Sequence, residues 1–204
     1  MYVELRYDQE AMARPRSETA RQAALEATVE TLLTCGVEGV TFDGIAAASG
    51  VAKTTLYRHF GSKQAMIAAA AASQLEELPT PDTGDLLEDL RTIFSRWKSD
   101  PNKDEPDVLS VLLGAADTDP ELHRLLMAML DERRRPVRTV LQLAQLRGEI
   151  GADVDLDIVL ALLGGPFVQR KLVDKLEITD EFRDAVITQV VSGLRADASS
   201  RTTT

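Results

Sequence analysis

The sequence predicts an all-α protein of about nine helices. Apolar residues recur at spacings of three and four along most of the 204-residue chain, which places them on one face of a helix. Sustained alternation of apolar and polar residues, the pattern typical of strands, is almost absent. No proline occurs between Arg16 and Leu78, so helices in this part of the chain can form without a proline break.

Four helices are expected in the first third of the chain. Ser17 is a favourable N-cap for the first, which should end near Gly36. Gly50 separates two very short helices, and Ser62 can cap the fourth. The expected ranges are 17–34, 42–48, 52–60 and 62–78.

Five longer helices are expected in the remainder. Pro136 lies inside the third of these and should bend it. Proline and glycine residues lie near several of the expected boundaries. The expected ranges are 85–98, 106–116, 120–147, 155–167 and 180–194.

The helix that begins near Asp155 is apolar nearly all round, so more than one of its sides should be buried. Contact with a second copy of the chain, related by two-fold symmetry, is the simplest way to bury these sides. Gly164 and Gly165 would permit close approach of the helices. A fully internal helix is the alternative. The expected homodimer interface lies on the last two helices and comprises Leu156, Val159, Leu160, Leu163, Phe167, Val186, Ile187, Val190 and Leu194.

The net charge of −10 is unevenly divided along the chain. Up to Lys63 there are 7 basic and 8 acidic residues, a net charge of −1, whereas the residues from Gln64 onward hold 16 and 25, a net charge of −9. A nucleic-acid-binding protein needs a local cationic face and not a basic chain throughout. The first part can therefore carry such a face.

The composition also points to a compartment. No apolar run approaches the roughly 18 residues of a membrane-spanning helix, and Met1–Ala13 lacks the apolar core of a signal peptide. The single cysteine, Cys35, fits a reducing environment. We therefore expect a cytoplasmic protein.

The two short helices have the pattern of a helix-turn-helix. Ile45, Val51 and Leu56 have the spacing of two short helices packed at a steep angle, and Gly50 supplies the tight turn because a positive φ costs glycine little. Phe60 extends the apolar side of the second helix. This arrangement leaves the polar side chains of the second helix outside the core, as a recognition helix requires. These side chains are Lys53, Thr54, Thr55, Tyr57, Arg58 and His59.

This segment resembles the TetR (tetracycline-repressor) family. The resemblance lies in Ile45-Ala46, in the run from Gly50 to Phe60, and in Ser62-Lys63, and the strong match covers residues 17–75. Thr54 departs from the family pattern, which often has glycine or another small residue there. The resemblance implies a helix-turn-helix DNA-binding domain at 14–63, a ligand-sensing and dimerisation domain at 64–197, and a homodimer.

The predicted DNA contacts fall into two groups. Side chains at the start of a recognition helix reach base edges in the major groove, whereas the others reach phosphates and set the register. Thr41 and Lys63 each lie at a helix N-terminus, where free backbone N–H groups favour an anion. Arg58 is as consistent with a solvated or ion-paired role as with DNA contact. The expected base contacts are Lys53, Thr54 and Thr55, and the expected phosphate contacts are Thr41, Tyr57, His59 and Lys63.

A small-molecule effector is expected to bind in the ligand-sensing domain, where apolar residues would line its pocket. Aromatic and methionine residues at helical spacing are more often ordinary core than a ligand pocket, and His123 is the polar candidate among these residues. The apolar lining would suit an uncharged or amphipathic molecule. The candidate pocket residues are Phe94, Trp97, Leu109, Leu113, His123, Met127, Leu130 and Phe167.

An enzyme is not expected. With two histidines and one cysteine, neither a metal cluster of the usual ligand count nor a Cys–His pair is well supported, and no glycine-rich phosphate loop occurs. We therefore expect no metal and no cofactor. The function that these observations favour is a transcriptional repressor that a ligand releases from a pseudo-palindromic DNA operator. An activator, or a ligand-blind DNA-binding protein with the same helix-turn-helix, is the alternative.

Overall fold

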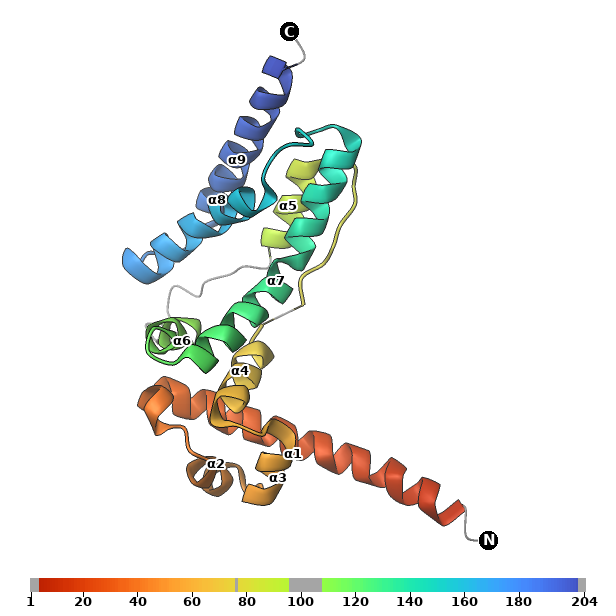
Figure 1. Cartoon of the computed structure of the whole chain (residues 1–204), viewed down its shortest axis with the longest axis vertical. Coiled ribbons are helices and arrows are strands. Elements are labelled where there is room, and N and C mark those ends of the chain that lie inside the picture. Colours follow the sequence, from red (N-terminus) through yellow and green to blue (C-terminus); the bar gives the residue numbers. More distant parts are fainter. Residues whose placement is uncertain (1–3, 76, 96–107, 202–204) are drawn as a thin grey trace. The chain divides into compact units, whose positions relative to one another are not determined.

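The computed structural model describes the backbone of residues 4–75, 77–95 and 108–201, and the side chains of 17–75, 77–95 and 108–195. Every regular element in these residues is a helix, as predicted (Figure 1). The chain forms two compact units: Met1–Leu75 with Glu105–Met129, and Glu76–Asp104 with Leu130–Thr204. None of the described helices is long and apolar enough to cross a membrane.

The first unit is built on one long helix. Its elements are α1 (Glu4–Gly39), α2 (Phe42–Ser49), α3 (Lys53–Phe60), α4 (Lys63–Ser73), α6 (Val108–Ala116) and the part of α7 (Pro120–Arg147) that precedes Leu130. Helix α1 contacts α2, α4 and α6. Leu25, Leu32, Ile45, Leu56 and Ile67 are buried side chains of this unit. Replacing one such leucine with alanine typically costs about 2–5 kcal/mol, so these residues hold the short helices in place.

Several helix boundaries differ from the sequence prediction; the last helix, α9 (Asp180–Arg201), runs beyond the expected end at Leu194. Helix α1 begins at Glu4 and not after Ser17, because the residues before Ser17 are mostly good helix formers and the helix continues through the expected cap. It loses helical geometry at Gly36, where φ is 68°, close to the predicted end. Helix α4 ends at Ser73 and not at Leu78; Leu78 precedes Pro79, and the residue before a proline is disfavoured in the α conformation.

The second unit comprises α5 (Leu86–Phe94), the part of α7 from Leu130 onward, α8 (Leu156–Val168), the π-helix η1 (Gln169–Val173) and α9 (Asp180–Arg201). An aromatic cluster lies in its core. The rings of Phe94 and Phe167 stack with centroids 5.3 Å apart, and Phe182 meets Phe167 edge-on at 5.9 Å. Such pairs add about 0.5–1.5 kcal/mol each to the burial of their area. Helix α9 contacts both α5 and α8.

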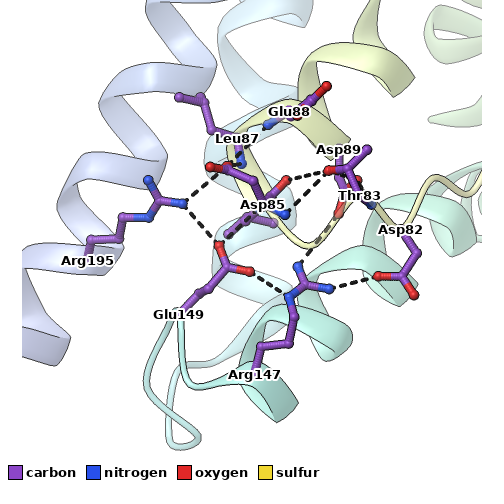
Figure 2. A network of polar contacts seen from close by, with 10 residues as sticks. Asp82, Thr83, Asp85, Leu87, Glu88, Asp89, Arg147, Glu149 and Arg195 are labelled. Carbon is purple, nitrogen blue, oxygen red and sulfur yellow. Dashed lines mark hydrogen bonds and ion pairs between the residues drawn. The ribbon is translucent and has the colours of Figure 1, made fainter.

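A network of charged groups joins α5, α9 and the end of α7 (Figure 2). Arg147 donates to Glu149 at 2.6 Å and to Asp82 at 3.0 Å, and Arg195 donates to Glu149 at 3.0 Å. Asp89 is fully buried and accepts from both the backbone N–H and the hydroxyl of Thr83, each at 2.8 Å. Both of these hydrogen bonds go to Oδ1, and Arg147 lies 3.6 Å from Oδ2, so polar and charged donors offset part of the desolvation of this carboxylate.

Candidate nucleic-acid interface

Helices α2 and α3 are joined by the tight turn that the sequence predicts. Thr41 caps α2, and its Oγ1 accepts from the backbone N–H of Gly44 at 3.0 Å. Gly50 adopts φ 70° and donates its N–H to the Ala46 carbonyl at 3.0 Å. Helix α3 then begins at Lys53. Local hydrogen bonds and one left-handed residue therefore set the geometry of the turn.

The core side of the helix pair is apolar and its outer side polar. Ile45 and Leu56 are fully buried, Val51 is buried, and Phe60 is half-buried. On α3 the exposed side chains are Lys53, Thr54, Tyr57 and Arg58, while Thr55 and His59 are half-buried. The outer face of α3 thus presents charged and hydroxyl hydrogen-bond donors to solvent.

Tyr57 is held in place by a ring of the preceding helix. Its ring stacks on that of Phe42, with centroids 3.9 Å apart and planes 18° from parallel. Phe42 is buried, whereas Tyr57 remains 48% exposed. The stacking orders the apolar part of Tyr57 and leaves one side of the residue accessible.

Lys53 has an intramolecular partner that the sequence analysis missed. Its Nζ lies 2.8 Å from Oδ1 and 2.9 Å from Oδ2 of Asp43, a residue in the first turn of α2. The hydrogen bond to Asp43 raises the pKa of Lys53 above its ordinary value. The two residues are ten positions apart across the turn, so helical spacing alone could not reveal the contact, although each lies in the first turn of a short helix.

His59 also has an intramolecular contact. Its Nε2 lies 3.3 Å from the hydroxyl oxygen of Ser17, within hydrogen-bond distance. Ser17, expected as the N-cap of the first helix, thus lies inside α1 and faces the end of α3 instead. A contact between His59 and a DNA phosphate would compete with the contact between His59 and Ser17.

The start of α4 carries both an expected anion site and two carboxylates. Ser62 caps α4 by accepting from the backbone N–H of Ala65 at 3.1 Å, and Lys63 is the first helical residue. The Ser62 hydroxyl donates to Oε1 of Glu121 at 3.2 Å, and the Gln64 amide donates to Oδ2 of Asp119 at 2.9 Å. Glu121 and Asp119 were not predicted to lie here.

Asp119 has a lowered pKa. Hydrogen bonds from the Leu122 backbone and from Gln64 stabilise its carboxylate, and the nearby charge of Lys63 acts in the same direction. Asp119 therefore remains ionised and places a negative charge near the first turn of α4. A DNA phosphate at this helix terminus would meet that charge.

The predicted ligand-pocket residues are distributed over both units. Phe94 and Phe167 pack on each other in the core of the second unit, which also contains the half-buried Leu130. Trp97 lies outside the described residues. His123 is exposed. The remaining candidates, Leu109, Leu113 and Met127, are half-buried residues of the first unit.

The predicted dimer-interface residues belong to the core of the second unit. Val159, Leu160, Leu163, Phe167 and Ile187 are buried there. Side chains buried within their own subunit have no surface left for direct contact with a second copy. The others pack against this core as half-buried residues: Leu156, Val186, Val190 and Leu194.

The exposed apolar residues of α8 are different ones. Ile158 is 59% exposed and Leu162 is 53% exposed, one helical turn further on. Ala161, Gly165 and Val168 are also exposed, and at 100° per residue all five fall on one side of the helix. Because α8 is apolar all round, its sequence could not distinguish this side from the buried one.

Two family models match the sequence and together cover most of it. The model described as bacterial regulatory proteins of the tetR family matches residues 24–70, which include α2 and α3. The model described as the tetracyclin repressor-like C-terminal domain matches residues 80–190.

Individual relatives agree with the family models. The chain is 28% identical over 194 residues to the HTH-type transcriptional regulator YdeS of Bacillus subtilis, covering 94% of this chain and 98% of that protein. It is 30% identical over 149 residues to the DNA-binding transcriptional repressor TetR of Mycobacteroides abscessus, covering 71% and 77%. A crystal structure of a TetR family transcription regulator matches with a TM-score of 0.66 and 31% identity, covering 85% of this chain and 97% of that one.

Proposed function

Because the chain belongs to the TetR family of bacterial transcriptional regulators, we propose that it is a cytoplasmic repressor that binds a pseudo-palindromic DNA operator as a homodimer. In this proposal residues 14–63 bind DNA, and residues 64–197 form the dimer and bind a small apolar or amphipathic effector. The effector releases the repressor from its operator.

The exposed polar face of α3 is the observation that carries this proposal. Lys53 and Thr54 lie at the start of the helix and are exposed, which suits contact with base edges in the major groove; we assign Thr55 to the same role. Tyr57, Arg58 and His59 follow along the helix and are assigned to phosphate contacts. Buried Leu56 anchors the helix on the opposite side.

Two helix N-termini flank this face in the sequence and are proposed to fix its register on DNA. Thr41 caps α2, and Lys63 is the first residue of α4. Unpaired backbone N–H groups at such positions attract phosphates and carry no sequence information. We therefore assign positioning to Thr41 and Lys63, and sequence readout to the start of α3.

The exposed apolar side of α8 supports a dimer through α8 and α9. A row of exposed apolar residues that includes Ile158 and Leu162 on one helix is unfavourable in water. Two-fold pairing would bury the same row on both subunits. Two DNA-binding units could then occupy half-sites about 34–36 Å apart or at a multiple of that distance.

Selection of bound sequences from random DNA at stated salt concentrations tests the DNA-binding assignment. The enriched sequences should be pseudo-palindromic. Lys53→Ala should lose both affinity and sequence preference, whereas Lys63→Ala should weaken binding to all sequences alike and reduce the salt slope by about one. Failure of the wild-type protein to enrich any sequence would contradict the proposal.

Effector release needs its own measurement. Calorimetry against a panel of uncharged and amphipathic metabolites should identify a saturable ligand, and that ligand should weaken operator binding about 5- to 150-fold, the range of typical allosteric couplings. A reporter gene placed behind the selected operator should be expressed more strongly when the protein is absent. Higher expression in its presence would indicate an activator instead.

A further inference from the structure

The pairing of Lys53 with Asp43 concerns two exposed residues at the starts of neighbouring helices. The Lys53 side chain is 45% exposed and that of Asp43 is 78% exposed. Both carboxylate oxygens lie within 2.9 Å of the Lys53 ammonium nitrogen. The lysine assigned to sequence readout is therefore paired with a carboxylate of opposite charge.

Asp43 is also unusual for its place in the sequence. The chain has 33 acidic residues, yet Asp43 is the only one between Glu38 and Glu76. That stretch contains α2, α3 and α4, and every proposed DNA contact lies within it. A carboxylate within it repels DNA phosphates, so its presence opposes affinity for DNA of any sequence.

The ion pair contributes little to folding. Pairs this exposed are screened by water and contribute between zero and a small amount to stability. Thr41 already caps α2 through its own side chain, so Asp43 is not needed for that. The larger consequence of Asp43 is therefore expected in DNA binding.

A free lysine and a paired lysine differ in what they can bind. A free ammonium is attracted to any phosphate, whereas a lysine–carboxylate pair has no net charge with which to attract the DNA backbone. An ammonium has three N–H donors, and Asp43 engages only part of them. The remaining donors suit the O6 and N7 acceptors that guanine presents in the major groove.

We propose that Asp43 is a positioning residue for sequence recognition, which holds Lys53 for a guanine edge and withholds it from phosphates. The inference rests on the proposed function, in which Lys53 reads base edges. Asp43 then lowers affinity for random DNA and increases the ratio of affinities between the operator and random DNA.

The test compares the wild-type protein with Asp43→Asn, Asp43→Glu and the matched control Glu38→Gln, using the operator selected by the wild-type protein and a random duplex. Glu38 is an exposed acid at the end of α1, and its replacement changes the net charge as Asp43→Asn does. Asp43→Asn should bind random DNA more tightly, with a salt slope steeper by about one. Its preference for guanine at one position of each half-site should fall about tenfold.

Asp43→Glu should retain the wild-type preference for guanine, because its longer side chain can still reach Lys53. Glu38→Gln should retain this preference as well. In a Lys53→Met background, Asp43→Asn should no longer change the guanine preference. An unchanged operator-to-random ratio in Asp43→Asn would overturn the inference and leave the proposed function intact. Absence of any selected operator for the wild-type protein would overturn both.

Discussion

Glu149 stabilises the first turn of α5 by accepting a hydrogen bond from the backbone N–H of Leu86, 3.0 Å from its Oε2. Leu86 is the first residue of α5 and is fully buried. The first N–H groups of a helix have no partner inside the helix, so the carboxylate of Glu149 satisfies one of them. Arg195 donates to the same oxygen, and Arg147 donates to Oε1 of this carboxylate (Figure 2).

This arrangement predicts a loss of stability in Glu149→Gln. Replacing the charged acceptor weakens three hydrogen bonds in a partly buried position, and we expect the free energy of unfolding to fall by about 1–3 kcal/mol. Urea denaturation measures the change. Glu88→Gln, an exposed residue in the first turn of α5, is the control and should change stability by less than about 0.5 kcal/mol.

The ionisation of Glu149 also makes the stability of the protein depend on pH. Burial opposes ionisation of Glu149, but hydrogen bonds from Leu86, Arg147 and Arg195 outweigh it and lower the pKa below the ordinary value of 4.5. The unfolded state therefore binds the proton more readily, so this contribution to stability is complete above pH 4.5 and is lost as the pH falls through the lowered pKa. Wild-type stability should decline more steeply than that of Glu149→Gln below pH 4.5. Parallel declines in urea denaturation would contradict this.

Tyr57→Phe separates the hydroxyl of Tyr57 from its ring. The variant keeps the stacking on Phe42 and should unfold at the same denaturant concentration as the wild type. If the hydroxyl donates to a phosphate, its loss should weaken binding to the operator and to random DNA by the same factor of about 2 to 10. Fluorescence anisotropy titrations with both duplexes measure this. Unchanged affinity would remove Tyr57 from the phosphate contacts.

Glu121→Gln tests the start of α4. The Glu121 carboxylate accepts from the Ser62 hydroxyl, close to the terminus that we assign to a DNA phosphate. Removing its charge should increase affinity for all DNA sequences alike, by about 2- to 5-fold at low salt. Asp117→Asn is the control, since Asp117 is also an exposed acid of the first unit. Equal increases in DNA affinity for the two variants would indicate a general effect of net charge, and not competition between the Glu121 carboxylate and a DNA phosphate.

Local signals explain what the sequence could predict. The left-handed Gly50 and the caps Thr41 and Ser62 depend on residues at most four positions away, so they follow from residue type. The helix-turn-helix was therefore predictable almost residue by residue. Helix α1 is the exception, because helix propensity upstream of Ser17 outweighed a good capping residue.

Contacts between distant residues could not be predicted in this way. Ser17 and His59 are 42 positions apart, and Ser62 and Glu121 are 59 apart. Such pairs depend on how helices pack, which periodicity does not specify. On α8 the periodic signal itself is missing: Ile158 is 59% exposed and the neighbouring Val159 only 1%, yet both are β-branched apolar residues. Only the packed structure distinguishes the two sides of this helix.

The exposed apolar side of α8 makes the proposed dimer testable. Leu162→Glu places a charge in the exposed apolar row of α8, where it costs the subunit's own core nothing. If this row is the interface, two-fold symmetry places the substitution in both subunits and buries two charges without partners. The protein should then be monomeric at micromolar concentration in analytical ultracentrifugation, with unchanged helical content. Operator affinity should fall, because one subunit contacts one half-site.

Leu146→Glu is the control for this experiment. Leu146 is 84% exposed and lies near the end of α7, so Leu146→Glu introduces the same side chain at an exposed apolar position outside the row on α8. It should remain a dimer and bind the operator normally. A Leu162→Glu protein that sediments as a dimer would exclude this side of α8 from the interface, and a monomeric Leu146→Glu would place the interface at the end of α7 instead.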